Sequence, residues 1–165
     1  VGRGIEVGHI FNFGTKYTKP LECYVLNKDG KRINPYMGSY GIGVSRLTAA
    51  IIEAFHDERG IKWPINISPF KINIIIQSNS DLNEEIEGLY NTLTSKYNNI
   101  SLDDRDLSIW RKLKDTELIG IPWTLIIGNN YKDKGQIEVI RRSDGDKVFL
   151  SKQEIENFEF EQYTP

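Results

Sequence analysis

Hydrophobic and polar residues alternate in the first part of the chain and then change to helical spacing. Between Gly4 and Tyr17, large and mostly apolar side chains occupy every second position, a period typical of a strand. Shorter strands are expected at 22–26 and 34–39, with a turn at 28–31. From Val44 onward, apolar residues recur at three- and four-residue steps. We therefore expect a small antiparallel unit, a glycine-rich stretch and a helix that ends near 56–60.

The second part of the chain alternates short apolar runs with segments of helical spacing. The apolar runs predict strands at 72–76, 100–103, 123–127, 136–142 and 147–150. Helices are expected at 82–97, between the second and third of these strands, and after the last one, where Ser151 and Glu154 form a capping signal. This order predicts an α/β fold with a mostly parallel mixed sheet flanked by helices.

The segment between Gly60 and Phe70 contains two prolines and neither periodicity, and the charge balance changes sign after it. Residues 1–70 carry nine Lys and Arg against six Asp and Glu, whereas residues 71–165 carry twelve against seventeen. These counts give net charges of +3 and −5. We therefore expect two domains, residues 1–68 and 69–165, neither of them basic enough to indicate nucleic acid by charge alone.

Composition narrows the class of protein. With 39% hydrophobic and 27% charged residues among 165, the chain is typical of soluble globular proteins, and no apolar run approaches the roughly 20 residues that span a membrane. The single cysteine, Cys23, cannot form an internal disulfide and has no neighbouring histidine, which favours a cytoplasmic protein without a metal site. Because the chain begins at Val1 and its only methionine is Met37, we expect a piece of a longer protein.

Candidate chemistry is densest around Gly41, Gly43 and Arg46. Glycines let the backbone approach a ligand, and the amides at the start of the following helix favour an anion. Arg46 in the first helical turn adds a guanidinium suited to phosphate oxygens. The Rossmann fingerprint does not fit, because Arg46 stands where a third glycine belongs. From spacing alone, a plain tight turn capped by a helix remains an alternative.

Several separated blocks resemble bacterial-type prolyl-tRNA synthetases, which are class II aminoacyl-tRNA synthetases. Gly-Ile-Glu-Val-Gly-His-Ile-Phe opens the first block, and Gly-Ile-Gly-Val-Ser-Arg lies in the second. The blocks at 4–17, 37–47 and 56–64 are similar in order and spacing to the end of the family's catalytic domain. The blocks at 102–105 and 117–122 are similar to its anticodon-binding domain. The resemblance implies an incomplete antiparallel-sheet catalytic domain at 1–68 and an anticodon-binding domain at 69–165.

The resemblance also implies the activity of the full-length protein. It would activate proline with ATP and Mg²⁺ to prolyl-adenylate, transfer proline to tRNA(Pro) and form a homodimer, while this part alone would be inactive. A noncatalytic RNA-binding paralogue, or a class II synthetase for another amino acid, remains an alternative.

Site residues in the first domain follow from the same resemblance. It implies that ATP is bound by Gly41, Gly43 and the catalytic Arg46, and proline by His9, Phe11, Ser39 and Gly41. A strand places His9 and Phe11 on one face, as a shared pocket requires. From the residues alone, a core histidine and a core aromatic remain alternatives. Serine at position 39 replaces a cysteine common in the family. Alternation places Glu6 on the strand face opposite to that of His9, and we expect Glu6 to form a structural ion pair.

For the second domain, which the resemblance implies to be an anticodon-binding module, a local basic patch around a candidate helix is the predicted RNA site. Its basic residues would contact phosphates, its tryptophan would stack on unpaired bases, and its carboxylates would contact base edges. The residues are Arg105, Trp110, Lys112, Lys114, Asp115 and Glu117. The alternative is a solvated amphipathic helix with Trp110 in the core. The family's Arg-Pro-Gly is replaced by Ser-Ile-Trp at 108–110, so this stretch departs from the family pattern.

Overall fold

The computed structural model describes residues 2–77 and 84–160. The chain divides into two compact units, Val1–Ile51 and Ile52–Pro165. This division precedes the domain boundary expected at residue 69, because the end of the helix at Val44–Ala54 and the residues after it are grouped with the second unit. The boundary at 69 therefore remains a prediction about domain identity, distinct from this division by contacts.

The first unit is built around two antiparallel strands, as expected. Strand β1 (Gly8–Gly14) pairs with β4 (Met37–Ile42), and β2 (Val25–Leu26) pairs with β3 (Arg32–Ile33) in a small hairpin. The single strand expected at 34–39 is wrong: β3 ends at Ile33 and β4 begins at Met37. Pro35 lies in the break, where it has no N–H to donate to a ladder.

Helix α1 (Val44–Ala54) begins at the predicted residue. The sequence predicted irregular structure beyond this helix, but the chain forms two short strands there. Strands β5 (His56–Asp57) and β6 (Gly60–Ile61) form a tight hairpin in the second unit.

The second unit contains a five-stranded mixed sheet with the order β11-β10-β9-β7-β8. Strand β7 pairs in parallel with β8 and β9, whereas β10 pairs antiparallel with β9 and β11. The mixed α/β prediction is confirmed. Half of the sheet is antiparallel because only residues 128–135 separate β9 from β10, too few for a parallel crossover. The strands are β7 (Ile72–Ile76), β8 (Ile100–Asp103), β9 (Trp123–Ile127), β10 (Gln136–Arg141) and β11 (Lys147–Ser151).

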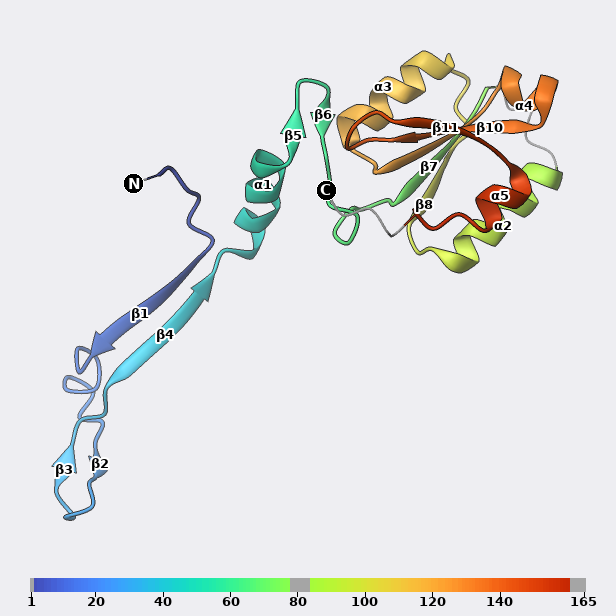
Figure 1. Cartoon of the computed structure of the whole chain (residues 1–165). Helices are drawn as coiled ribbons and strands as arrows, with labels where there is room; N and C mark the ends of the chain where they lie inside the picture. Colours follow the sequence, from blue (N-terminus) through green and yellow to red (C-terminus); the bar gives the residue numbers. More distant parts are fainter. Residues whose placement is uncertain (1, 78–83, 161–165) are drawn as a thin grey trace. The chain divides into compact units, whose positions relative to one another are not determined.

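Helices cover both faces of this sheet (Figure 1). Helices α2 (Glu84–Lys96) and α5 (Lys152–Glu156) lie on one face and α3 (Ile109–Ile119) lies on the other. We call these the α2 face and the α3 face. The expected capping box is present at the start of α5, and a short helix that the sequence analysis missed, α4 (Asn129–Lys134), joins β9 to β10. No helix among the described residues is both long and apolar enough to cross a membrane.

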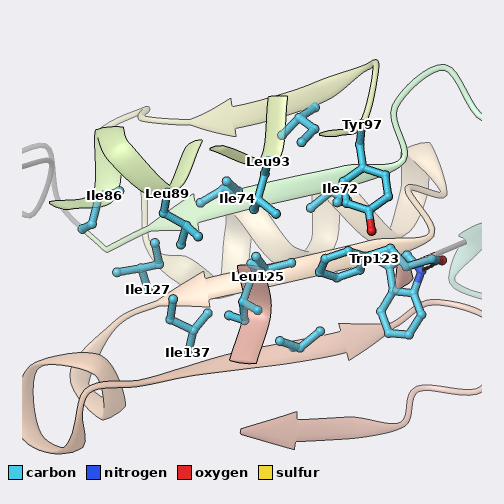
Figure 2. Close-up of a cluster of buried hydrophobic side chains, with 14 of the residues drawn as sticks. Ile72, Ile74, Ile86, Leu89, Leu93, Tyr97, Trp123, Leu125, Ile127 and Ile137 are labelled. Atoms are coloured by element: carbon cyan, nitrogen blue, oxygen red, sulfur yellow. Dashed lines mark hydrogen bonds between the residues drawn. The ribbon is translucent and has the colours of Figure 1, made fainter. Parts of the chain in front are cut away.

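The hydrophobic core fills the α2 face (Figure 2). Alternate residues of β7 and β9 point toward α2 and α5, where they meet three fully or almost fully buried side chains of α2. The other alternate positions face α3, and several of them are polar. The core residues labelled in Figure 2 are Ile72, Ile74, Ile86, Leu89, Leu93, Tyr97, Trp123, Leu125, Ile127 and Ile137. The buried polar residues include Asn73, Lys112, Thr116 and Thr124.

The β5–β6 hairpin is fixed to the end of α3 by a close backbone approach. A Cβ atom on Gly120, which has φ +84°, would lie 2.4 Å from the Ile61 carbonyl oxygen. A Cβ on Gly60 would lie 2.5 Å from Leu118 Cα. Because a side chain at either position would overlap backbone, only glycine lets the two segments meet this closely.

Hydrogen bonds complete this anchoring. Arg142 donates from two nitrogens to the Asp57 carboxylate at 2.6 and 2.8 Å, and also to the Gly60 carbonyl. Trp63 Nε1 donates to the Ile119 carbonyl at 2.9 Å. The Arg142 side chain is 5% exposed and the Asp57 side chain 30%, so this ion pair is partly shielded from water.

Candidate functional site

Strand register brings together the residues predicted to bind proline. In the β1–β4 ladder, His9 lies opposite Gly41 and Phe11 lies opposite Ser39. The His9 and Phe11 rings are 4.4 Å apart between centroids. A Cβ on Gly41 would lie 3.0 Å from Phe11 Cε2, so glycine leaves room for this ring. The four residues therefore belong to one short two-stranded surface.

His9 is not a core residue of the first unit, because its side chain is 51% exposed. Phe11 is also exposed at 39%. The expectation that Glu6 lies opposite His9 is wrong: Glu6 Oε2 lies 3.9 Å from His9 Nδ1. Strand alternation fails there because β1 begins only at Gly8. The ion pair expected of Glu6 would therefore involve His9 when that imidazole is protonated.

Arg46 lies in the first turn of α1, where the glycine-rich strand β4 ends. Its Nη1 donates to the Glu6 carbonyl at 2.9 Å, and Gly43 N donates to the Val7 carbonyl at 2.9 Å. Both bonds attach the start of α1 to the residues that precede β1. Since a guanidinium has five N–H donors, Arg46 can hold this contact and still donate to an anion.

In the second unit, Arg105 is held between two carboxylates. Its Nε and Nη2 donate to Asp103 at 2.9 and 2.7 Å, and its Nη1 lies 2.9 Å from Asp115 Oδ2. The hydrogen bonds from Arg105 hold the pKa of the Asp103 carboxyl below its ordinary value, and those to Asp103 and then Asp115 raise the pKa of Arg105. The guanidinium, whose side chain is 48% exposed, is thus held in one orientation at the surface.

Trp110 lies on the exposed side of α3. It is 68% exposed, so the alternative that placed it in the core is wrong. Lys114 Nζ lies 5.9 Å from the centroid of the Trp110 ring and 2.8 Å from Glu117 Oε2. Arg59 Nη1 lies 3.3 Å from the other Glu117 oxygen. The exposed Trp110 ring therefore lies beside a series of charged groups formed by Lys114, Glu117 and Arg59.

Lys112 departs from the predicted arrangement. It was expected to contact RNA, but its side chain is fully buried on the α3 face. Its Nζ donates to the carbonyls of Ile76 at 2.8 Å and Asp103 at 3.1 Å. In this conformation Lys112 presents no surface to a ligand, because the helical position that it occupies faces the sheet.

A cavity of about 220 Å³ lies between β8 and α3. Of its polar lining residues, only Arg105 and Asp115 were predicted as site residues. Asn73 Nδ2 donates to Thr116 Oγ1 and Ser101 Oγ donates to Asn73 Oδ1, both at 2.7 Å. An asparagine inside an otherwise all-isoleucine strand was the available signal, because a buried amide needs partners. The polar lining includes Asn73, Ser101, Asp103, Arg105, Asp115 and Thr116.

A family model described as "Anticodon binding domain" matches residues 67–159. The chain belongs to this family. The start of the match lies two residues before the expected second domain, and the anticodon binding domain includes β8, α3 and the whole five-stranded sheet. The polar surface of α3 therefore lies within the anticodon binding domain.

Curated relatives extend the similarity over nearly the whole chain. Proline–tRNA ligase of Persephonella marina is 45% identical over 157 residues, 94% of this chain and 28% of that protein. Proline–tRNA ligase of a Wolbachia from Drosophila simulans is 45% identical over 146 residues, 88% of this chain and 34% of that protein. The chain thus spans about a third of the length of these relatives, and the resemblance noted in the sequence is confirmed.

Solved structures agree with these relatives. A Giardia lamblia prolyl-tRNA synthetase in complex with prolyl-adenylate matches 94% of this chain and 34% of its own, with a TM-score of 0.77 and 26% identity. A Cryptosporidium parvum prolyl-tRNA synthetase matches 92% of this chain and 32% of its own, with a TM-score of 0.78. At 19% identity, the second supports the fold alone.

Proposed function

We propose that this chain is the C-terminal part of a proline–tRNA ligase and that its second unit binds the anticodon loop of tRNA(Pro). In the full-length protein, proline would be activated with ATP to prolyl-adenylate and transferred to the tRNA. One observation carries the RNA-binding role: in a member of the anticodon binding domain family, Arg105 is fixed between Asp103 at the end of β8 and Asp115 on α3, the helix that also exposes Trp110.

The chemistry of this surface suits unpaired bases. An exposed indole offers a stacking platform, and a planar guanidinium can stack or donate in its plane. Asp115 and Glu117 can accept from the amino groups of a base edge, which is compatible with a net charge of −5 over residues 71–165. Lys114, which is 48% exposed and paired with Glu117, supplies a cation for a phosphate. Lys112 is left out of the contact set because it is buried.

For the first unit, we propose the roles that the family resemblance implies. His9, Phe11, Ser39 and Gly41 would line the proline pocket, and their place in one strand pair supports this. Gly41, Gly43 and Arg46 would bind ATP, where the guanidinium would stabilise charge that develops on the phosphates. Arg46 is thus the proposed catalytic residue of this chain.

No cluster of three or more His, Cys, Asp or Glu side chains in the described residues could hold a metal ion. In this proposal Mg²⁺ enters with ATP as a substrate of the full-length protein. The partners proposed for the full-length protein are proline, ATP, tRNA(Pro) and a second copy in a homodimer. Its proposed location is the cytoplasm, and this chain alone is expected to be inactive in aminoacylation.

The proposal predicts that the chain binds an anticodon stem–loop of tRNA(Pro) more tightly than the same stem–loop with a changed anticodon. Trp110→Ala should weaken binding by about 1–3 kcal/mol through lost base stacking. Lys114→Met should weaken binding to both RNAs alike and reduce the salt slope by about one. Fluorescence anisotropy titrations at several salt concentrations measure both effects.

Lys147→Met is the matched control, because Lys147 is an exposed lysine on β11, at the sheet edge opposite β8. Equal affinity for the two stem–loops, or an equal loss in the control, would contradict the anticodon role. In the full-length protein, ATP–pyrophosphate exchange that depends on threonine or alanine in place of proline would contradict the ligase assignment.

A further inference from the structure

Lys112 places its side-chain nitrogen inside the protein, at the outer limit of ion-pair distance from Asp103. It is among the largest fully buried side chains of the described residues, and its nearest described carboxylate oxygen, Asp103 Oδ1, lies 4.0 Å away. Burial of an ammonium group costs several kcal/mol unless strong acceptors surround it. An apolar residue would fill this position with a smaller desolvation cost. The presence of lysine is therefore explained by the groups to which it donates hydrogen bonds.

Its acceptors are the ends of two parallel strands. Lys112 Nζ donates to the carbonyls of Ile76, the last residue of β7, and Asp103, the last residue of β8. In the β7–β8 register, Asp103 pairs with Ile75, so the two carbonyls lie just where the ladder ends. The Lys112 amino group therefore joins both strand ends to the first half of α3.

Asp103 connects this buried group to the surface. While its carbonyl accepts from Lys112, its carboxylate accepts two bonds from Arg105. The Arg105 backbone N–H also donates to Asp103 Oδ1 at 3.3 Å. Displacement of Asp103 would therefore move the guanidinium that the proposed RNA site presents.

We propose that Lys112 is a positioning residue for anticodon recognition, which holds Asp103 so that Arg105 is presented to the RNA in one orientation. This inference rests on the proposed function of the α3 surface. It assigns Lys112 an indirect role in place of the direct contact expected from the sequence. The ammonium charge also favours the ionised form of Asp103, which the clamp on Arg105 requires.

The test is Lys112→Met, which removes the charge and keeps an unbranched side chain of similar volume. Replacement of a buried charge by an apolar group often leaves the fold intact. We expect a cooperative unfolding transition as in the parent chain, but about tenfold weaker binding of the tRNA(Pro) stem–loop. Lys147→Met should bind as the parent does. If Lys112→Met does not fold, Lys112→Gln is measured with the same criteria.

A double-variant cycle separates positioning from general structural damage. Asp103→Asn should weaken binding by itself, and Lys112→Met should then add less than about a twofold loss, because it acts through Asp103. Binding of Lys112→Met within twofold of the parent, or an undiminished loss in the Asp103→Asn background, would overturn the proposal.

An RNA-free measurement keeps this inference apart from the proposed function. By NMR, Lys112→Met should raise the pKa of the Asp103 carboxyl and broaden the Arg105 Nε–H signal. A parent chain that fails to bind the stem–loop contradicts the proposed function only. Unchanged Asp103 and Arg105 signals in Lys112→Met contradict the positioning role, whatever RNA the chain binds.

Discussion

The two faces of the five-stranded sheet differ in the chemistry of their buried side chains. On the α2 face, isoleucine, leucine and aromatic side chains form one continuous apolar cluster. On the α3 face, Asn73, Ser101 and Thr116 are joined by hydrogen bonds, and Lys112 is buried among carbonyls. One sheet therefore serves as a hydrophobic wall on one side and as a polar support for the proposed RNA surface on the other.

The difference shows how stability and specificity are divided between the faces. Apolar contacts are nondirectional and tolerate small shifts, whereas a buried polar network requires particular donors at particular angles. We therefore expect the α2 face to contribute most of the free energy of folding, and the α3 face to fix the orientation of side chains near Arg105. Substitutions on the two faces should differ in size and in response to pH.

The largest loss is expected on the apolar face. Leu93→Ala removes a fully buried side chain from the centre of the α2 face and should lower the free energy of unfolding by about 3 kcal/mol. Urea denaturation followed by circular dichroism measures it. Leu118→Ala is the control, because Leu118 is 63% exposed on α3 and should change stability by less than about 0.5 kcal/mol. Similar losses of stability in Leu93→Ala and Leu118→Ala would contradict the assignment of the main core to the α2 face.

A charged contact beside α3 should give a smaller and pH-dependent loss. Asp57→Asn weakens the bidentate pair with Arg142 and should cost about 2 kcal/mol at pH 7. Hydrogen bonds from Arg142 hold the pKa of the Asp57 carboxyl well below its ordinary value in the folded protein. The unfolded chain therefore binds the proton first as pH falls, and this contribution is lost progressively below about pH 4.

Unfolding free energies at pH 7 and near pH 3 test whether the stabilisation by the Asp57–Arg142 pair decreases in acid. The gap between the parent chain and Asp57→Asn should narrow at the lower pH, whereas the gap caused by Leu93→Ala should stay constant. Glu58→Gln, at an exposed neighbouring position, serves as the control. A gap that widens in acid would contradict the role of the Asp57–Arg142 pair.

The smallest effect concerns the neutral part of the polar face. Thr116→Val removes the hydroxyl that accepts from Asn73 and should cost about 1.5 kcal/mol, because a buried amide loses a partner. Addition of Asn73→Val should cost less than the sum of the two single changes. Thermal unfolding of the three variants, with the exposed Thr92→Val as control, measures this coupling. Strict additivity would show that the network does not act as a unit.

Periodicity was sufficient to predict most elements of the second unit. The strands at 72–76, 100–103 and 123–127 match the structure, as does the capping box at Ser151, because apolar runs and caps are local signals. The antiparallel half of the sheet was less accessible. It depends on the short connection through α4, whose polar sequence carries no apolar stripe.

Long-range packing accounts for what the sequence did not predict. The β5–β6 hairpin exists because Gly60 and Gly120, far apart in the chain, let two backbones meet. The burial of Lys112 is equally invisible locally, because a lysine between Arg111 and Lys114 looks like part of a solvated basic face. Only the positions of the Ile76 and Asp103 carbonyls show that its ammonium belongs inside.

The three tryptophans of the chain occupy three separate environments. Trp123 is buried in the core, Trp63 is bonded to the end of α3 through its indole nitrogen, and Trp110 is open to water beside Lys114. The molecule thus carries its own optical reporters. Emission from Trp123 reports unfolding, emission from Trp63 reports release of the β5–β6 hairpin, and quenching of Trp110 by a stacked base reports RNA binding. Single-tryptophan variants therefore separate these three events without an attached dye.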